Sequence, residues 1–255
     1  MARLGMDIGS RSVKIVLWEN NNILASRILD TGSFYRDFCI RSSEGLEPKF
    51  NELGIGDFDS IVCTGYGRNN LKIKSAKIIV ELKAHALGAM WQTGLTDFTL
   101  LDIGGQDSKV ISIKNSKMVD VLLNDKCAAS CGRYLENMCT VIGINSSEIS
   151  RYYNDPVELN STCAVFAESE LIGLISEGYA IENLSAGVNY SLFKKIKPIL
   201  ERFLSDKLVV TGGVAYNNAL KYFLSKELSF NEIIIPPNPQ INGAIGCCVS
   251  GVHNE

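Results

Sequence analysis

The feature that most constrains the fold is a repeat of two short segments 95 residues apart. Residues 4–17 and residues 100–113 each predict a strand, a glycine turn and a returning strand, and the residues around their turns align without a gap at an offset of 95. The identical positions are the pairs Asp7 and Asp102, Ile8 and Ile103, Gly9 and Gly104, and Lys14 and Lys109. A repeat of this length predicts two copies of one α/β unit, with a ligand cleft between them, rather than a solenoid of short modules.

We therefore expect a first half over residues 1–96, joined by the last helix of residues 241–255, and a second half over residues 97–240. Apolar spacing and turn residues predict the other elements. The predicted strands cover residues 61–65, 207–210 and 230–235, and the predicted helices cover residues 76–91, 128–142, 164–177, 181–204 and 243–252.

Composition narrows the class of protein. Charged residues make up 21% of the 255 residues and the net charge is -3, so we expect no nucleic acid and no anionic membrane as partner. No apolar run approaches the roughly 20 residues of a membrane span, and the start lacks the apolar core of a signal peptide, so we expect a cytoplasmic protein. Eight cysteines in such a chain favour packing, redox or metal roles over disulfides.

The repeated turns are candidate phosphate-binding elements. A glycine turn between two strands directs backbone N–H groups into a concave space, and aspartates beside it suit Mg²⁺. One such turn is often just a tight turn, but two at matching positions favour phosphate. Lys14 and Lys109 either contact phosphate or face outward from the returning strand. The candidates are Asp7, Asp102 and Asp107 for Mg²⁺, and Ser10, Arg11, Ser12, Lys14, Gly104, Gly105, Gln106 and Asp107 for phosphate.

A third glycine turn, in residues 211–218, joins a predicted strand to a helix and allows the close approach of an adenosine. Its candidate contacts are Gly212, Gly213, Val214 and Asn217. With two phosphate turns and one adenosine turn in this order, the chain resembles the actin, sugar kinase and heat-shock chaperone superfamily over nearly its whole length. The resemblance implies a duplicated ribonuclease-H-like α/β fold that binds ATP or ADP.

Two cysteine motifs narrow the resemblance further. They are residues 124–129 (Asn-Asp-Lys-Cys-Ala-Ala), followed by residues 132–136, and residues 163–170, which begin at Cys163. Together with residues 65–68, 85–89 and 239–244, they resemble the ATP-dependent activators of 2-hydroxyacyl-CoA dehydratases and the related benzoyl-CoA reductase-type ATPases.

This resemblance implies a homodimer in which Cys127 and Cys163 of each protomer bind one shared 4Fe-4S cluster. ATP hydrolysis would drive a low-potential electron to an iron-sulfur dehydratase, a reductase or a double-cubane cluster protein. A ferredoxin or flavodoxin would supply the electron, in an anaerobic host. We assign Asp7, Asp102 and Gln106 as the candidate catalytic residues, with Gln106 orienting the attacking water, and Glu136 and Gln240 as further candidate nucleotide contacts.

The positions of Cys127 and Cys163 support their role as cluster ligands, because each precedes a predicted helix whose first N–H groups stabilise the negative charge of a thiolate. The family usually has Gly-Thr where this chain has Ser130 and Cys131. A cluster within one chain, on Cys127, Cys131, Cys139 and Cys163, ranks second because the chain has no C-x₂-C spacing. Packing roles are expected for Cys39, Cys63, Cys139, Cys247, Cys248, His85 and Glu81.

Two other functions fit the same fold. A small-molecule kinase would need an acceptor pocket with a base, which no sequence feature identifies. A nucleotide-dependent assembly module would use its cysteines only for packing.

Overall fold

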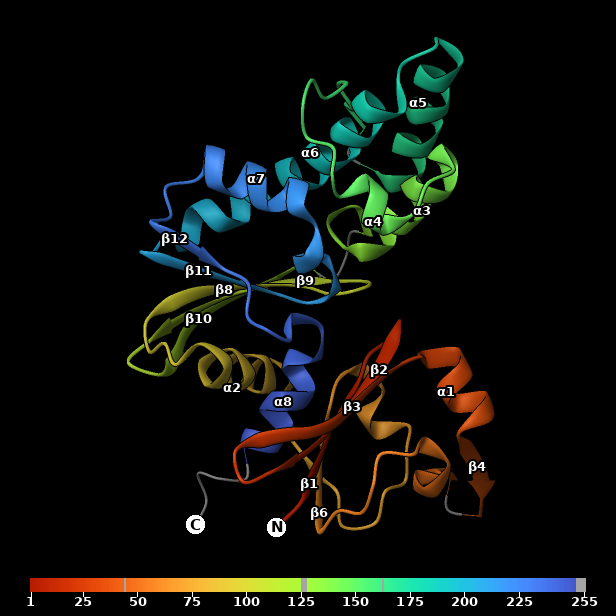
Figure 1. Ribbon diagram of the computed structural model, residues 1–255, viewed down its shortest axis with the longest axis vertical. Coiled ribbons are helices and arrows are strands. Elements are labelled where there is room, and N and C mark those ends of the chain that lie inside the picture. Colours follow the sequence, from red (N-terminus) through yellow and green to blue (C-terminus); the bar gives the residue numbers. More distant parts are fainter. Residues whose placement is uncertain (44, 125–127, 162, 251–255) are drawn as a thin grey trace. The chain divides into compact units, whose positions relative to one another are not determined.

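The computed structural model describes residues 1–43, 45–124, 128–161 and 163–250. The chain divides into two compact units, unit 1 (Met1–Thr96 and Pro236–Glu255) and unit 2 (Asp97–Ile235). Each unit has one five-stranded sheet (Figure 1). Among the described helices, none combines the length and the apolar character that a membrane span requires.

The two sheets have the same topology, which confirms the predicted repeat. The strand order is β3-β2-β1-β6-β7 in unit 1 and β10-β9-β8-β11-β12 in unit 2. In both sheets the first three strands are antiparallel and the last three are parallel. The strands are β1 (Arg3–Ile8), β2 (Ser12–Glu19), β3 (Asn22–Asp30), β6 (Ser60–Thr64), β7 (Lys77–Ile78), β8 (Phe98–Ile103), β9 (Ser108–Lys114), β10 (Lys117–Asn124), β11 (Lys207–Thr211) and β12 (Glu232–Ile234).

The turns of the repeat also match. The β2–β3 turn has Asn20 and Asn21 at φ 49° and 62°, and the β9–β10 turn has Asn115 and Ser116 at φ 49° and 60°. Two successive residues with positive φ give a two-residue hairpin whose twist suits the flanking strands, and asparagine tolerates this conformation. The matching turns therefore set the same strand register in both units.

In unit 1, the two faces of the sheet are covered by different elements. Leu4, Met6 and Ile8 on alternate positions of β1 pack with Phe34 of α1. On β2, Val16 and Trp18 pack instead with α8, which also contacts β1 and β6. The elements are α1 (Thr31–Asp37), α2 (Glu81–Thr93), α8 (Asn242–Val249), and a small hairpin of β4 (Cys39–Ser42) and β5 (Gly45–Pro48).

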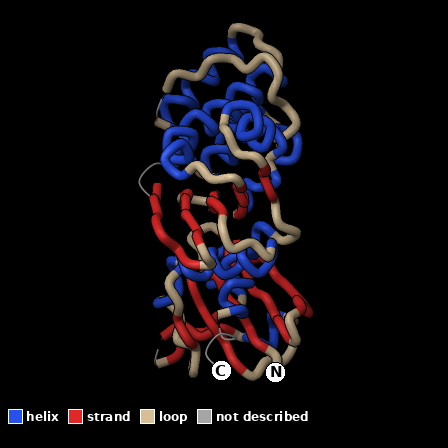
Figure 2. The backbone as a smooth tube through the Cα atoms, turned by 90° about the vertical axis from the view of Figure 1, so that its left-hand side faces the viewer, coloured by secondary structure: helices blue, strands red, loops and turns tan. Residues whose placement is uncertain are grey.

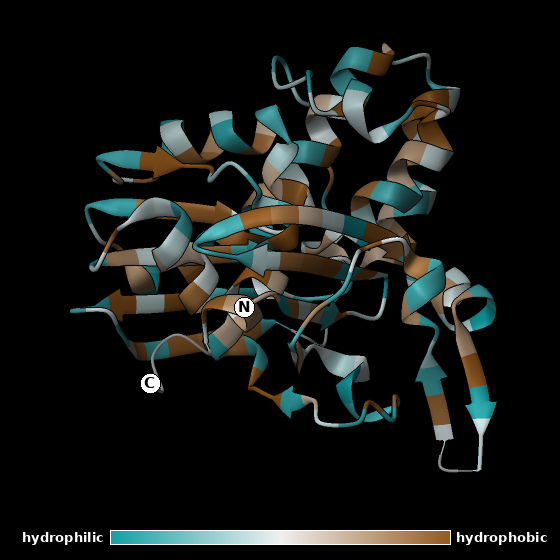
Figure 3. Ribbon diagram, turned by 60° about the horizontal axis from the view of Figure 1, so that its bottom comes forward, coloured by the Kyte–Doolittle hydropathy of each residue, from teal (hydrophilic) through white to brown (hydrophobic). Residues whose placement is uncertain are grey.

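Unit 2 has one large core that joins its sheet to its helices. Figure 2 shows the helices of this unit, in blue, gathered above its strands, and Figure 3 shows hydrophobic residues, in brown, along several strands of the molecule. Within this core, Phe193 and Phe223 stack with ring centroids 5.8 Å apart. The helices are α3 (Gly132–Ile142), α4 (Ser146–Ile149), α5 (Ala164–Ser176), α6 (Ile181–Leu200) and α7 (Asn218–Glu227).

Three helix predictions are wrong in part. The helix predicted over residues 76–91 starts only at Glu81, because residues 77–78 pair with β6 as β7 and the Ile79 N–H bonds to the Cys63 carbonyl. The helix predicted over residues 181–204 ends at Leu200, before a 3-10 turn at Glu201–Phe203. The helix predicted over residues 128–142 is broken at Cys131, between a 3-10 turn (Ala128–Ser130) and α3.

Candidate functional site

The first glycine turn, in unit 1, combines a buried carboxylate with a lysine. Asp7 lies near the end of β1 and is 3% exposed, and one of its oxygens is 3.2 Å from Lys14 Nζ. The turn is closed by a hydrogen bond of 3.2 Å from the Gly9 N–H to the Ser12 carbonyl.

The second turn, in unit 2, repeats this arrangement 95 residues later. The Gly104 N–H donates to the Asp107 carbonyl at 2.9 Å. Lys109 is 4% exposed, and its Nζ is 2.7 Å from the Asp107 carboxylate and 3.8 Å from the Asp102 carboxylate. The alternative that the two lysines face outward is therefore wrong, since both ammonium groups turn in toward the aspartates.

Two glycines pack closely against the Asp7 carboxylate. A Cβ at Gly65 would lie 2.7 Å from one Asp7 oxygen, and a Cβ at Gly243 would lie 3.1 Å from the other. The Cβ position at Gly243 is also 3.2 Å from His85 Nε2, which is itself 3.8 Å from Glu81. Sequence reasoning assigned His85 and Glu81 to packing and missed this proximity. The spacing of four residues between them on one helix was the available signal.

The third glycine turn lies against the second one. Gly212 has φ +86°, and a Cβ there would lie 2.1 Å from the Ile103 carbonyl oxygen, so no other residue fits without a shift. The neighbouring Thr211 hydroxyl donates to the Asp102 carboxylate at 2.7 Å. The adenosine candidates Gly212, Gly213 and Val214 therefore adjoin the strand end that carries Asp102.

Asn217, another adenosine candidate, is used inside unit 2. Its side-chain oxygen caps α7 by accepting from the Leu220 N–H at 2.9 Å, and its amide donates to Asn189 at 2.8 Å. The Asn217 side chain is 6% exposed, and it stabilises the conformation of the turn from inside unit 2.

Helix α3 begins directly on the second glycine turn. The Gly132 and Arg133 N–H groups donate to the Gly104 and Gly105 carbonyls, both at 2.9 Å. A Cβ at Gly132 would lie 3.2 Å from the Gly104 oxygen and 3.4 Å from Val214. Gly132 thus lies close to both the second and the third glycine turn, at the start of the helix that follows the first cysteine motif.

Among the cysteines, Cys163 is the exposed thiol of the described residues, and it is the N-cap residue of α5. Cys127 lies outside the described residues. The expectation that the α-helix follows it directly is wrong, because α3 is capped by Cys131, whose side chain is fully buried. No cluster of three or more metal-ligating side chains is found in the described part of the chain, which does not support Cys131, Cys139 and Cys163 as joint ligands.

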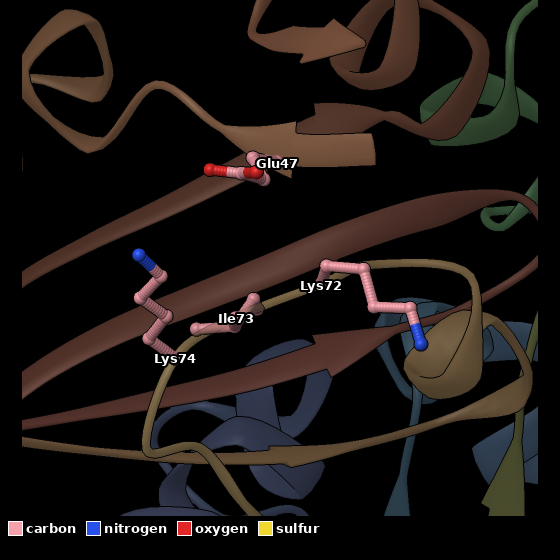
Figure 4. A pocket seen from close by; sticks show the side chains of 4 residues that line it. All are labelled: Glu47, Lys72, Ile73 and Lys74. Atoms are coloured by element: carbon pink, nitrogen blue, oxygen red, sulfur yellow. The ribbon is translucent and has the colours of Figure 1, made fainter. Parts of the chain in front are cut away.

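The other predicted contacts lie at the surface or in local ion pairs. Ser10 and Gln106 are exposed, whereas Ser12, Gly105 and Gln240 are half-buried. The Arg11 guanidinium is 2.5 Å from the Asp30 carboxylate, which caps α1, and Glu136 pairs with Arg133 at 3.2 Å. A small hollow elsewhere on unit 1, lined by Glu47, Lys72, Ile73 and Lys74, includes none of the predicted site residues (Figure 4).

Comparison with known proteins identifies the family. Residues 4–251 match the BadF/BadG/BcrA/BcrD ATPase family. The chain belongs to this ATPase family. The match covers both glycine turns and both cysteine motifs, so the resemblance inferred from those motifs is confirmed.

Two relatives within the family are similar over almost their whole length. The chain is 37% identical to the 2-hydroxyisocaproyl-CoA dehydratase activator of Clostridioides difficile, covering 98% of this chain and 94% of that protein. It is 35% identical to the (R)-2-hydroxyglutaryl-CoA dehydratase activating ATPase of Acidaminococcus fermentans, covering 96% and 95%. The solved structure of the Clostridium difficile activator with bound ADPNP matches with a TM-score of 0.86, at 36% identity and covering 98% and 94% of the two chains.

A more distant structural match concerns the fold alone. A glucokinase of the ROK family from Streptomyces griseus matches with a TM-score of 0.53 at 12% identity, covering 97% of this chain and 98% of that one. Together with the matching sheets, these comparisons confirm the predicted fold of the actin and sugar kinase type.

Proposed function

We propose that the protein is an ATP-hydrolysing activator that delivers single low-potential electrons to a partner iron-sulfur enzyme. The partner would be a 2-hydroxyacyl-CoA dehydratase, a benzoyl-CoA reductase-type enzyme or a double-cubane cluster protein. Membership of the ATPase family and the names of the two activator relatives support this proposal. A reduced ferredoxin or flavodoxin is the proposed electron donor, in the cytoplasm of an anaerobe.

The glycine turns are the proposed nucleotide contacts. The turns at Gly9 and Gly104 would bind phosphate, and the turn at Gly212 would bind adenosine, because glycine turns can direct backbone N–H groups toward a ligand. The carboxylates of Asp7 and Asp102 are the proposed ligands of a hydrated Mg²⁺, which would neutralise phosphate charge. Gln106, exposed on the second turn, is the proposed residue that orients the attacking water.

The observation that carries the proposal is the bonding of α3 to the second turn. Because the Gly132 and Arg133 N–H groups donate to the Gly104 and Gly105 carbonyls, a shift of this turn moves the start of α3. The described end of the first cysteine motif, Ala128 and Ala129, lies in the 3-10 turn just before α3. A movement of the second turn when ATP is replaced by ADP would therefore be passed to the cysteine segment through these hydrogen bonds and the chain that follows the segment.

The proposed 4Fe-4S cluster fits the chemistry of Cys163. Its thiol is exposed, it caps a helix of 13 residues whose free N–H groups stabilise negative charge, and Val165 and Phe166 beside it are each 69% exposed. Exposed apolar residues next to a metal-binding thiol suit a surface that a second copy of the chain covers. We propose Cys127 and Cys163 of two protomers as the four ligands, and the cluster would store the transferred electron.

Metal analysis tests this function. After anaerobic purification we expect about four irons and four sulfides per dimer, lost in Cys127→Ser and Cys163→Ser and retained in Cys131→Ser. Two irons or none per dimer, or unchanged content in the first two variants, would refute the cluster. Phosphorylation of a small molecule by iron-free protein would favour a kinase. Undiminished ATP turnover and no colour in both serine variants would favour an assembly module.

A further inference from the structure

The backbone that leads into Cys163 is held by a carboxylate from the helix that follows it. Glu170 Oε1 accepts from the Asn160 N–H at 2.9 Å, and Oε2 accepts from the Ser161 N–H at 3.0 Å. Glu170 lies on α5, about two turns after Cys163. The charged side chain of Glu170 therefore reaches back to the segment that precedes the first residue of α5.

Two lysines of α6 bind the carbonyls of the same segment. Lys194 Nζ donates to the Leu159 carbonyl at 3.2 Å, and Lys195 Nζ donates to the Ser161 carbonyl at 3.4 Å. Residues 159–161, here called the strap, lie outside every helix and strand. The backbone N–H and C=O groups of the strap therefore bond to charged side chains instead of to the backbone of a helix or strand. Such charge-assisted hydrogen bonds are stronger than neutral ones.

Lys195 also reaches the helix that is bonded to the second glycine turn. Its Nζ donates to the Ser191 hydroxyl at 2.9 Å and lies 5.2 Å from the ring centroid of Tyr134 on α3. Burial raises the pKa of Tyr134 to about 12, so the ring stays neutral and attracts the cation through its face. A continuous path of contacts thus runs from Gly104 through α3 and Lys195 to the strap.

We propose that Glu170, Lys194 and Lys195 are positioning residues that clamp the strap and so fix Cys163, and that Tyr134 couples this clamp to the nucleotide turn. The role of Cys163 as a ligand rests on the proposed function. The clamp itself is a property of the metal-free chain and can be tested without iron.

Hydrogen–deuterium exchange of the metal-free, full-length protein tests the clamp. In Glu170→Gln we expect the Asn160 and Ser161 amides to exchange roughly tenfold faster, because the charged, bidentate acceptor is lost. Glu177→Gln, at the end of α5, is the matched control and should leave these amides unchanged. If Glu170→Gln does not fold, Glu170→Asp retains the charge on a shorter side chain and should show a smaller acceleration. Unchanged exchange in a folded variant would overturn the clamp.

A second measurement tests the coupling and separates the two proposals. In the wild type, replacing ADP by a non-hydrolysable ATP analogue should change exchange in the strap, and Lys195→Met should abolish that response. In loaded protein, Glu170→Gln should release iron to a chelator several-fold faster than Glu177→Gln. Faster strap exchange in a protein that never binds iron would leave the clamp standing and refute the cluster. No nucleotide response in the wild-type strap would overturn the coupling.

Discussion

The Gly132 backbone N–H donates a hydrogen bond of 2.9 Å to the Gly104 carbonyl. This bond joins the first residue of α3 to a turn that lies at the end of β8, in the same unit. It depends on a residue without a side chain, because a Cβ at Gly132 would lie 3.2 Å from the Gly104 oxygen and 3.5 Å from the Gly105 Cα.

Gly132→Ala should therefore weaken the link between nucleotide and α3 without unfolding the protein. The neighbours must yield by a few tenths of an ångström, so we expect the affinity for an ATP analogue to fall several-fold, while the free energy of unfolding changes by about 1 kcal/mol or less. Titration calorimetry and urea unfolding measure the two quantities. The control is Gly173→Ala on α5, where a Cβ meets no atom within 4 Å. Equal nucleotide affinities in both variants would contradict the prediction.

Lys109 and Lys14 occupy the same place in the two repeats but differ in burial. The Lys109 side chain is 5% exposed and contacts two carboxylates, whereas the Lys14 side chain is 17% exposed and contacts Asp7. Removing one partner of a buried ion pair leaves an uncompensated charge, so Lys109→Met should cost about 3 kcal/mol or more of unfolding free energy. Lys14→Met, the matched variant, should cost less.

Mg²⁺ should restore part of the stability lost in Lys109→Met. The variant leaves the carboxylates of Asp102 and Asp107 without the ammonium group between them, and a divalent cation can take its place. Urea unfolding with and without Mg²⁺ measures the recovery. A loss in Lys14→Met as large as that in Lys109→Met would show that burial does not decide the cost.

The sequence predicted the two glycine turns because both lie between apolar strands, β1 with β2 and β8 with β9, whose residues are buried nearly throughout. It did not predict β3 or β10. Both are edge strands with mostly exposed residues, so neither carries the apolar alternation that marks a half-buried strand.

At the site, the aspartates and glycines could be predicted from local sequence, but the partners of their side chains could not. The ion pairs of Lys109 and the cap made by Asn217 depend on where separate elements meet. Likewise, the local signals of the break at Cys131 are weak, because Ser130 and Gly132 are poor helix formers that also occur inside helices. Tertiary packing against the second turn sets where α3 begins.

Cys63 gives a prediction for alkaline pH. It is 1% exposed on β6, and desolvation raises the pKa of its thiol from 9.0 to about 12. Above pH 9 the thiol ionises in the unfolded chain but stays protonated in the folded one, so its contribution to stability is complete below pH 9 and is lost as pH rises toward 12. The loss should be about 1.4 kcal/mol of unfolding free energy per pH unit for this thiol.

Cys63→Ala should flatten this pH dependence, because the variant has no thiol to ionise at that position. Anaerobic urea unfolding at several pH values between about 9 and 11 measures the slope. Part of the slope should remain, since burial also raises the pKa of Cys247 and Cys248. Ser60→Ala on the same strand should keep the wild-type slope. If Cys63→Ala loses stability with pH as steeply as the wild type does, Cys63 ionises as readily in the folded protein as in the unfolded chain.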